Sequence, residues 1–293
     1  MKDNIVQVDI RKQYMSDMQR YSLYVLFERY IPAIDGLKPV QRRVLYCMWH
    51  DIKCVSVATK RKSANTVGTV IAKYHSHGDA SVYECMKVLV NWIEIKVPLL
   101  IYDSNSGSLQ GGPQAAMRYT ESCLSQFSID AVIGDLAESS MVVDWSKTFD
   151  NHTEEPDLLP IKVPLLLING TFGIAIGRRI EVPKHSLNDV VDATLAVMHN
   201  INSKVVLIPD PCQKCEVIEA DWKKISNMGF GYFIERGIVD ITTDTKTGIQ
   251  TLHLKSMPDM IFSNTVVDKI EELIKQNKHV QISDIQDHST EDQ

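Results

Sequence analysis

An arginine and a tyrosine stand side by side at Arg118 and Tyr119, after a polar, glycine-containing stretch. A phenol attacks poorly near neutral pH because its pKa is about 10. A neighbouring guanidinium stays charged, and its paired N–H donors match the oxygens of a transferring phosphoryl group. The pair therefore predicts attack by Tyr119 on a phosphodiester, with Arg118 stabilising the charge and a phosphotyrosyl bond as product. The alternative is a tyrosine that only packs against the core.

The composition is that of a globular protein. The 293 residues carry 44% hydrophobic and 23% charged side chains, enough for two domains with separate cores. The longest apolar run, Val163 to Ile176, is too short to span a bilayer, and the N-terminus lacks the apolar core of a secretory signal. We expect a cytoplasmic protein without a membrane partner.

Positive charge gathers in one part of a chain whose formal net charge is −6. We call residues 37–77 the basic segment, in which Asp51 is the single acid. Its cationic residues are Lys38, Arg42, Arg43, Lys53, Lys60, Arg61, Lys62 and Lys73, joined by His50, His75 and His77. The distribution predicts an electropositive surface for nucleic acid. The run from Lys60 to Lys62 alone is also typical of a solvated face.

Two helices are expected around the start of the basic segment. Over residues 8–30, apolar side chains recur at Tyr14, Met18, Tyr21 and Val25. The second helix begins at Pro39, because proline suits a first helical position.

The same helical spacing places Arg42 and Arg43 largely off the buried stripe of the second helix. We therefore expect both guanidinium groups to face solvent or a ligand.

A glycine turn joins the next two expected helices. The turn His75 to Gly78 separates a helix capped by Ser63 from one that reaches Trp92 on its inward face. This order indicates a helix-turn-helix, or else an ordinary helical hairpin. Residues 98–119 then change to an extended pattern around a polar loop, as in a wing. Tyr119 should lie where the returning strand enters another helix.

The second half of the chain predicts a mixture of helices and strands. The acidic stretch 150–160 marks the expected domain boundary, and residues 164–177 predict two strands around a glycine turn. The latter lack the lysine and hydroxyl ending of a phosphate loop. The remaining expected elements are a helix with a capping box of Ser186 and Asp189, a helix near 221–226, a β-hairpin over 238–254, a helix capped by Asn264 and a strand over 280–285. The fold class is therefore α+β.

Six cysteines are scattered without a disulfide framework, as expected of reduced thiols. Cys212 and Cys215 are closely spaced, but neither a second pair nor two histidines follow at zinc-site spacing. We expect no metal site on this chain.

Four motifs in one order resemble the A subunits of DNA gyrase and topoisomerase IV. They are DGLKPVQRRVLY at 35–46, KYHSHGD at 73–79, AMRYTE at 116–121 and NGTFGIAIG at 169–177. The resemblance covers about residues 24–290 and is weaker between 205 and 255. It implies a type IIA topoisomerase subunit with three parts. These are an N-terminal helical arm over 1–25, a winged-helix breakage-reunion domain over 26–149 and an incomplete α/β tower domain over 150–293.

The resemblance also assigns roles to single residues. Tyr119 would attack a backbone phosphate, stay joined to the 5′ end and release a 3′ hydroxyl, while Arg118 would stabilise the phosphorane. The implied contacts to double-stranded DNA are Arg29, Lys38, Arg42, Arg43, Lys62, His75 and His77. Ile174 would wedge between bases and bend the duplex. A metal pair at His75 and His77, and a buried strand position for Ile174, are the alternatives.

Metal and nucleotide are implied for a partner. In the resembled enzymes a B subunit brings the ATPase and the acidic domain that binds Mg²⁺. Two A subunits form a two-fold dimer in an A2B2 complex, and each cuts one strand. Religation needs no ATP, since the phosphotyrosyl bond preserves the energy of the broken link. This chain alone should be inert.

Some positions depart from the family pattern. Gln41 replaces a histidine, and the loop before Tyr119 is one residue shorter. Ala80 stands where quinolone-sensitive relatives carry a serine, and Glu84 is the next drug-linked acid. We therefore expect weak quinolone binding, because Ala80 has no hydroxyl to hold the drug's water-bound metal.

The largest departure is length, because the chain ends before the coiled coil and exit gate of the family. We expect a truncated chain, or a split, nucleoid-associated subunit of a viral or mobile element that a second polypeptide completes. A non-catalytic DNA clamp and an inactive copy are the rival interpretations.

Overall fold

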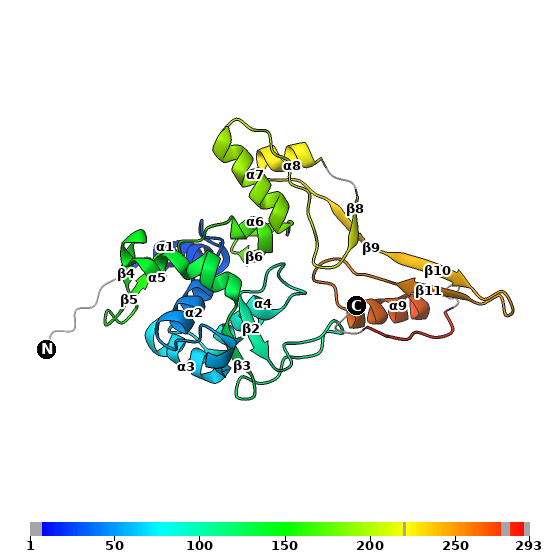
Figure 1. The fold of residues 1–293 in the computed structure, drawn as a ribbon, viewed down its shortest axis with the longest axis horizontal. Coiled ribbons are helices and arrows are strands. Elements are labelled where there is room, and N and C mark those ends of the chain that lie inside the picture. Colours follow the sequence, from blue (N-terminus) through cyan, green and yellow to red (C-terminus); the bar gives the residue numbers. More distant parts are fainter. Residues whose placement is uncertain (1–7, 219–220, 277–281, 290–293) are drawn as a thin grey trace.

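The structure is a computed structural model that describes residues 8–218, 221–276 and 282–289. Helices and small antiparallel sheets follow one another along the chain, so the α+β class is confirmed. A helical body lies at one side, and a long β-hairpin with the last helix extends away from it at the other (Figure 1). No helix in the described ranges is long and apolar enough to cross a membrane.

The helical body is built on α2 (Pro39–His50), α3 (Ser63–Lys73) and α4 (Asp79–Val90). Their apolar faces meet in one core, in which Val44, Met48, Val67 and Met86 are each at most 1% exposed. These three helices are confirmed as expected. The inward position of Trp92 is wrong, because α4 ends at Val90 and the indole is 41% exposed.

The first helix differs from the other three in its packing. α1 (Ile10–Val25) continues into a π-helical turn, η1 (Leu26–Tyr30). Its expected apolar face is largely exposed, with Tyr14 and Tyr21 facing solvent and Val25 buried. The apolar spacing therefore predicted the helix correctly, but the prediction that its apolar face is buried is wrong.

A three-stranded antiparallel sheet closes the body below α3. Its strands are β1 (Arg61–Lys62), β3 (Glu121–Leu124) and β2 (Leu100–Asp103), in that spatial order. The helix expected after Tyr119 is wrong, since this stretch pairs as β3 with both neighbours. Cys123 and Leu124 bury their side chains there, so tertiary pairing overrides any local helical preference. The chain turns helical only in η3 (Ser128–Ile133) and α5 (Gly134–Glu138).

Short elements follow in the second half. They are β4 (Trp145–Lys147), β5 (Glu154–Pro156), α6 (Leu165–Asn169), β6 (Thr171–Ala175), β7 (Arg178–Val182), α7 (Leu187–His199), β8 (Cys215–Ile218), α8 (Trp222–Met228), β9 (Ile234–Gly237), β10 (Val239–Thr243), β11 (Gln250–Leu254) and α9 (Ser263–Gln276). The strands pair in sequential hairpins, except that β8 and β9 enclose α8. The expected hairpin over 238–254 is confirmed, with Val239 opposite Leu254.

Several local expectations are corrected. The first of the two strands expected over 164–177 is the short helix α6, and only the second part forms β6. Ser63 is the first residue of α3 rather than its cap, and Ser186 caps α7 without a side-chain hydrogen bond. Asn264 lies inside α9. Of the expected strand over 280–285, residues 280–281 lie outside the described ranges and 282–285 are not a strand.

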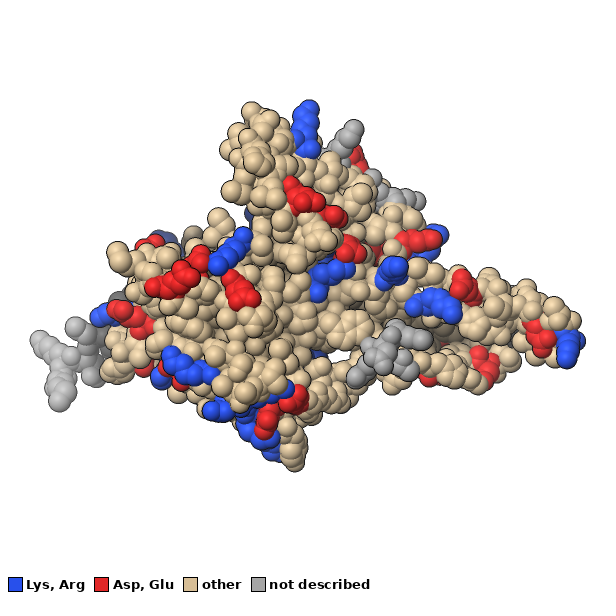
Figure 2. All heavy atoms as spheres, in the orientation of Figure 1, with Lys and Arg blue, Asp and Glu red and all other residues tan. Residues whose placement is uncertain are grey.

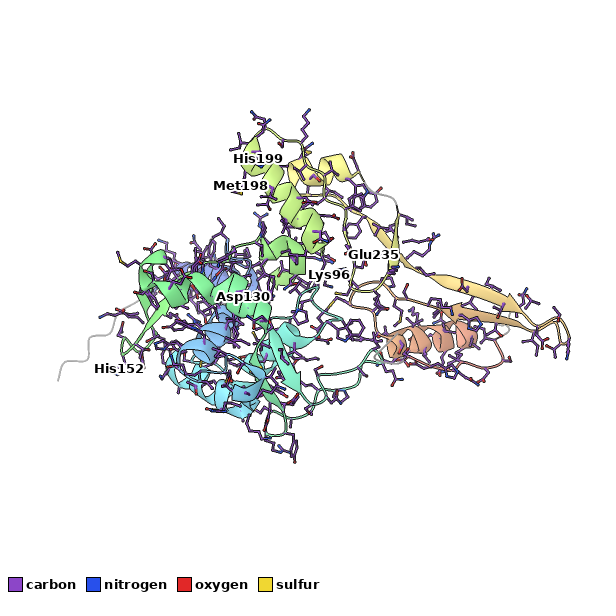
Figure 3. All side chains as sticks on the ribbon, in the orientation of Figure 1. Lys96, Asp130, His152, Met198, His199 and Glu235 are labelled. Atoms are coloured by element: carbon purple, nitrogen blue, oxygen red, sulfur yellow. The ribbon has the colours of Figure 1, made fainter. Side chains whose placement is uncertain are left out.

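A chain of polar contacts joins the body to the second half. Lys96 Nζ lies 2.6 Å from Asp210 Oδ2, and Lys184 Nζ lies 2.7 Å from Asp259 Oδ2. The backbone N–H of Asp210 donates to the carbonyl of Lys184, and that of Asp259 donates to Glu235. Lys96 and Glu235 lie at this junction, below the end of α7 that carries Met198 and His199 (Figure 3). Burial raises the pKa of Glu235 above its usual range.

Candidate active site and nucleic-acid interface

The turn that carries Arg118 and Tyr119 is tied to the first residues of α3. The backbone N–H of Ser63 donates to the carbonyl of Thr120 at 2.9 Å, and that of Ala64 donates to Met117 at 3.2 Å. The amide of Tyr119 donates to Ala116 within the turn. The first N–H groups of a helix have no partner within the helix. Here the turn supplies two of those partners, which fixes its position.

Buried hydroxyls support the same turn from below. Thr120 is fully buried, and its hydroxyl donates to Ser63 Oγ at 2.7 Å. The hydroxyl of Tyr83, on α4, donates to the carbonyl of Ala115 and lies 3.1 Å from Thr120 Oγ1. Tyr83 therefore holds both ends of the segment that contains Tyr119.

The two chemical groups themselves face outward. Tyr119 is 61% exposed, and the Arg118 guanidinium lies over its ring at 4.6 Å from the centroid. Within the described parts of the chain, Arg118 forms no ion pair. The geometry leaves this cation beside an accessible phenol, as nucleophilic attack on a phosphodiester requires.

A second group of predicted residues lies at the opposite end of α3. His75 and His77 follow this helix, with their rings edge to face at 4.7 Å between centroids. Arg43 NH1 lies 3.2 Å from His75 Nδ1, and Arg29 NH2 lies 3.4 Å from His77 Nε2. The 11 residues of α3 span about 16 Å at 1.5 Å per residue. The structure therefore brings these four residues together and separates them from Tyr119.

Arg43 is already paired. Its guanidinium makes a two-bond contact with Glu155 on β5, at 2.8 Å from Nε and 2.7 Å from NH2. A cleft of about 270 Å³ beside the pair is lined by residues that include Phe27, Arg43 and Glu155. Burial and the nearby Arg43 charge lower the pKa of His75 to about 4, so its ring is neutral near pH 7.

Arg42 corrects the expectation that both arginines face outward. Its side chain is buried, and its Nε lies 2.6 Å from Asp35 Oδ2. A second nitrogen donates to Asp35 Oδ1 and to the carbonyl of Leu37. The sequence pattern placed Arg42 outside the apolar face of its helix. Asp35 is buried in the body, however, and its ion pair with Arg42 holds the guanidinium in the interior. Its predicted DNA contact stays untested.

The predicted wedge lies on the β6–β7 hairpin. Ile174 is 55% exposed and pairs with Arg179 across the strands, so the alternative of a buried strand residue is wrong. The hairpin sits close to η1, because a Cβ at Gly173 would lie 2.5 Å from the carbonyl oxygen of Tyr30. Lys38 donates to the carbonyl of Phe172 at 2.8 Å, and burial lowers its pKa. Lys38, at the start of α2, thus contacts the strand that carries Ile174.

The basic segment is less positive in three dimensions than in sequence. Acids from other parts of the chain pair with Arg42, Arg43, Lys60 and Lys62, and Asp51 pairs with Lys73. The partner of Lys62 is Glu121, at 2.8 Å. Blue and red side chains accordingly alternate over the lower left of the surface, where α3 lies (Figure 2). The electropositive surface expected over the basic segment is therefore corrected to one of mixed charge.

The two residues predicted to match the drug site, Ala80 and Glu84, lie on α4. Ala80 and Glu84 are both exposed and one helical turn apart. Glu84 lies 3.8 Å from Lys87. Their predicted effect on quinolone binding stays a prediction.

Sequence reasoning missed three supporting residues. Tyr24 on α1 lies 2.6 Å from His77 Nε2, Glu155 pairs with Arg43, and Tyr83 supports the tyrosine turn. Each is distant in sequence from the residue it touches. Only Tyr83 had a signal, since its helical position faces the buried side of α4. In the described ranges no three His, Cys, Asp or Glu side chains gather as a metal site.

Comparison with known proteins identifies the family of this fold. The profile of the family of DNA gyrase and topoisomerase IV A subunits matches residues 29–293. The gyrase A protein of Nicotiana benthamiana, named as chloroplastic/mitochondrial, is 33% identical over 301 residues, covering 98% of this chain and 31% of the relative. That of Salmonella typhimurium is 33% identical over 302 residues, covering 98% and 33%.

A shorter relative matches more closely over a smaller region. The gyrase A protein of Spiroplasma citri is 40% identical over 197 residues, which are 67% of this chain and 85% of that relative. Against the longer relatives, the chain spans about a third of their length. The family match covers both ends of α3 and the β6–β7 hairpin. The chain belongs to the family of DNA gyrase and topoisomerase IV A subunits.

Proposed function

We propose that this chain is the DNA-cleaving and religating part of a type II topoisomerase. The observation that carries the proposal is the exposed Tyr119 with the Arg118 guanidinium over its ring, within the family match. The Tyr119 oxygen would attack a backbone phosphorus, forming a phosphotyrosyl bond at the 5′ end and releasing the 3′ oxygen. The phenol proton passes to solvent, and the 3′ oxygen takes up a proton. Religation reverses both bonds.

Arg118 would stabilise the charge that develops on the phosphate oxygens. Its guanidinium offers several N–H donors and lies beside the phenol before DNA binds. Buried Thr120 and partly buried Tyr83 hold the turn, so its geometry is set in advance. Such preorganisation costs no rearrangement at the moment of reaction.

The second group would hold the duplex near the cleaved bond. Arg29, Arg43, His75 and His77 lie together, and Lys38 and Ile174 continue the surface along β6. We propose that these residues contact the backbone, with Ile174 opening a base step. The spacing along α3 means that the two groups would contact different phosphates.

A winged-helix domain over 26–149 and part of a tower domain over 150–293 remain part of the proposal. The support is the order α2, α3, α4 and a three-stranded sheet, with the loop between β2 and β3 as the wing. The N-terminal arm would be residues 1–25.

Partners complete the proposed enzyme. A two-fold dimer of this chain would cut both strands, in an A2B2 complex with a B-type subunit. Mg²⁺ and ATP would belong to that subunit, as the family match implies. The bound metal would assist the leaving oxygen.

The rival function is a clamp that binds bent duplex without cutting it. Both functions predict a steep dependence of DNA affinity on salt, because phosphate contacts dominate. Arg118, which has no acidic partner among the described residues, lies beside the exposed Tyr119. This arrangement favours cleavage, since a clamp has no need of an accessible phenol.

The test is a covalent adduct. The chain is mixed with a B-type subunit from the same source, Mg²⁺ and plasmid, and is then trapped with detergent and digested with protease. We expect linear DNA that carries a protein tag in the wild type and not in Tyr119→Phe. The matched control is Tyr102→Phe, which removes a buried hydroxyl nearby. Tight binding without an adduct would support the clamp.

A further inference from the structure

His75 and His77 follow α3, and their neighbours determine which ring nitrogen of each donates a hydrogen bond and which accepts one. The Arg43 guanidinium carries only donors, so His75 Nδ1, at 3.2 Å from NH1, must accept. A neutral ring has one N–H, which then lies on Nε2. Burial and the Arg43 charge favour the neutral ring.

The same logic gives His77 the opposite arrangement. Its Nε2 lies 3.4 Å from Arg29 NH2 and 2.6 Å from the Tyr24 hydroxyl. An N–H on Nε2 would point at a cationic donor, so Nε2 accepts and the proton lies on Nδ1. Tyr24 then donates its hydroxyl hydrogen, and the Arg29 guanidinium lies 5.5 Å from its ring centroid.

Two residues outside the four sequence motifs hold the groups around the histidines in place: Glu155 binds Arg43, and Tyr24 contacts His77. Glu155 uses both carboxylate oxygens on Nε and NH2 of Arg43, which leaves NH1 directed at His75. The pair is largely buried, with side chains 21% and 14% exposed. Paired N–H donors on a carboxylate restrict the guanidinium to one plane. Tyr24 likewise fixes the Nε2 side of His77.

The remaining ring nitrogens have no hydrogen-bond partner among the described residues. His75 is 7% exposed, and its one side-chain contact there is made by Nδ1. His77 is half-buried, and in the described ranges only its Nε2 has hydrogen-bond partners. The turn between the helices thus offers two N–H donors from adjacent rings.

We propose that Glu155 and Tyr24 are positioning residues that fix His75 as the Nε2–H tautomer and His77 as the Nδ1–H tautomer, so that both rings donate to DNA phosphate. The phosphate contact rests on the proposed function. Glu155 offsets the charge of Arg43, while Arg29 forms no ion pair in the described ranges. The two N–H groups would therefore fix where a phosphate binds, beside the one cation at this end of α3 that no acid among the described residues offsets.

The tautomers can be measured without cleavage. The full chain is labelled with ¹⁵N-histidine, and long-range ¹H–¹⁵N spectra are recorded near pH 7, with His75→Gln and His77→Gln assigning the signals. We expect opposite neutral tautomers for the two rings. Glu155→Gln should turn His75 into a mixture, Glu155→Asp should restore most of the single tautomer, and Tyr24→Phe should affect His77 alone. Equal tautomers in the wild type, or no change in Glu155→Gln, would overturn the proposal.

Addition of a duplex tests the second half of the proposal. We expect the His75 Nε2 and His77 Nδ1 signals to shift on binding, while His253 on β11 serves as the distant control. Binding without these shifts would overturn the phosphate contact. If the histidine tautomers and the DNA-induced shifts are observed but no Tyr119 adduct forms, the cleavage function is refuted and the tautomer inference is not affected.

Discussion

The two ends of α3 present opposite designs. At the start of the helix, Tyr119 and Arg118 are exposed, and the arginine has no acidic partner in the described ranges. At its end, Arg43 is held by Glu155 and the histidines are fixed by arginines and Tyr24. An open end suits chemistry, because the cation must be free for the phosphate. A closed end suits placement of the duplex, because its groups already have fixed directions.

The largest expected effect is a loss of stability on replacing Arg42. This variant tests whether Arg42 stabilises the fold or is available to bind DNA. Removing one partner of a buried pair leaves an uncompensated charge, so Arg42→Ala should lower the free energy of unfolding by about 3–5 kcal/mol. Urea unfolding measures this loss. Arg61→Ala is the control, since Arg61 is exposed and, among the described residues, donates only to nearby carbonyls. Equal, small losses in both variants would show that Arg42 is not structural.

Arg118 tests the open end. Arg118→Ala should reduce the rate of DNA cleavage by about 10²–10³-fold, the usual cost of removing one group that stabilises the transition state. Duplex affinity should change much less, because many phosphate contacts remain. The detergent-trapped adduct is measured over time beside Arg61→Ala. A cleavage loss that merely follows the loss of binding would contradict the assigned role.

The pH dependence of stability tests the closed end. His75 has its pKa lowered to about 4 from an ordinary value near 6.5, so the unfolded chain binds more protons between these values. Stability should therefore fall as pH drops from about 6.5 to 4, by up to about 3 kcal/mol. Unfolding at several pH values measures it, and His75→Gln should flatten this part of the curve. The charges of Arg43, His77 and Arg29 act on the ring, and Arg43 has the largest effect of the three, so Arg43→Gln provides a second variant.

Tyr83 tests whether side-chain hydrogen bonds position the turn that carries Tyr119. Tyr83→Phe removes the hydroxyl that touches Ala115 and Thr120, a loss of about 1 kcal/mol for an ordinary hydrogen bond. We expect roughly tenfold slower adduct formation with unchanged duplex affinity. Tyr232→Phe, at an exposed site, is the control. An unchanged cleavage rate would show that the backbone bonds to α3 suffice.

The smallest expected effect on stability is that of Ile174. Because it is 55% exposed, Ile174→Ala should change the free energy of unfolding by less than about 0.5 kcal/mol. The bend of a bound duplex, measured by energy transfer between its ends, should decrease. Val239→Ala is the exposed-strand control. A large stability loss would make Ile174 a packing residue.

Local sequence pattern predicted the helices of the body and the C-terminal hairpin, because their apolar spacing matches the buried faces of α2, α3 and α4. It failed at β3, where pairing with β1 and β2 decides the conformation. Burial of α1 also failed, since helical spacing reports amphipathicity and not what covers the face.

The candidate site shows the same limit. Arg118 and Tyr119 could be singled out because their chemistry lies in adjacent residues. Glu155 could not, since it is 112 positions from Arg43 and stands in a stretch that resembles an acidic linker. A count of charges along the basic segment therefore overstated the field that DNA would meet. Pairing partners come from the fold and not from sequence neighbours.

The loop before Tyr119 has a second attachment, at the far side of the molecule. The carbonyl of Leu109 accepts from the backbone N–H of Ser263 at the start of α9, and Gly111 lies against the side chain of Asn264. About ten residues join this contact to the nucleophile. The segment that leads to Tyr119 is therefore anchored to α9 at one side and to the first residues of α3 at the other.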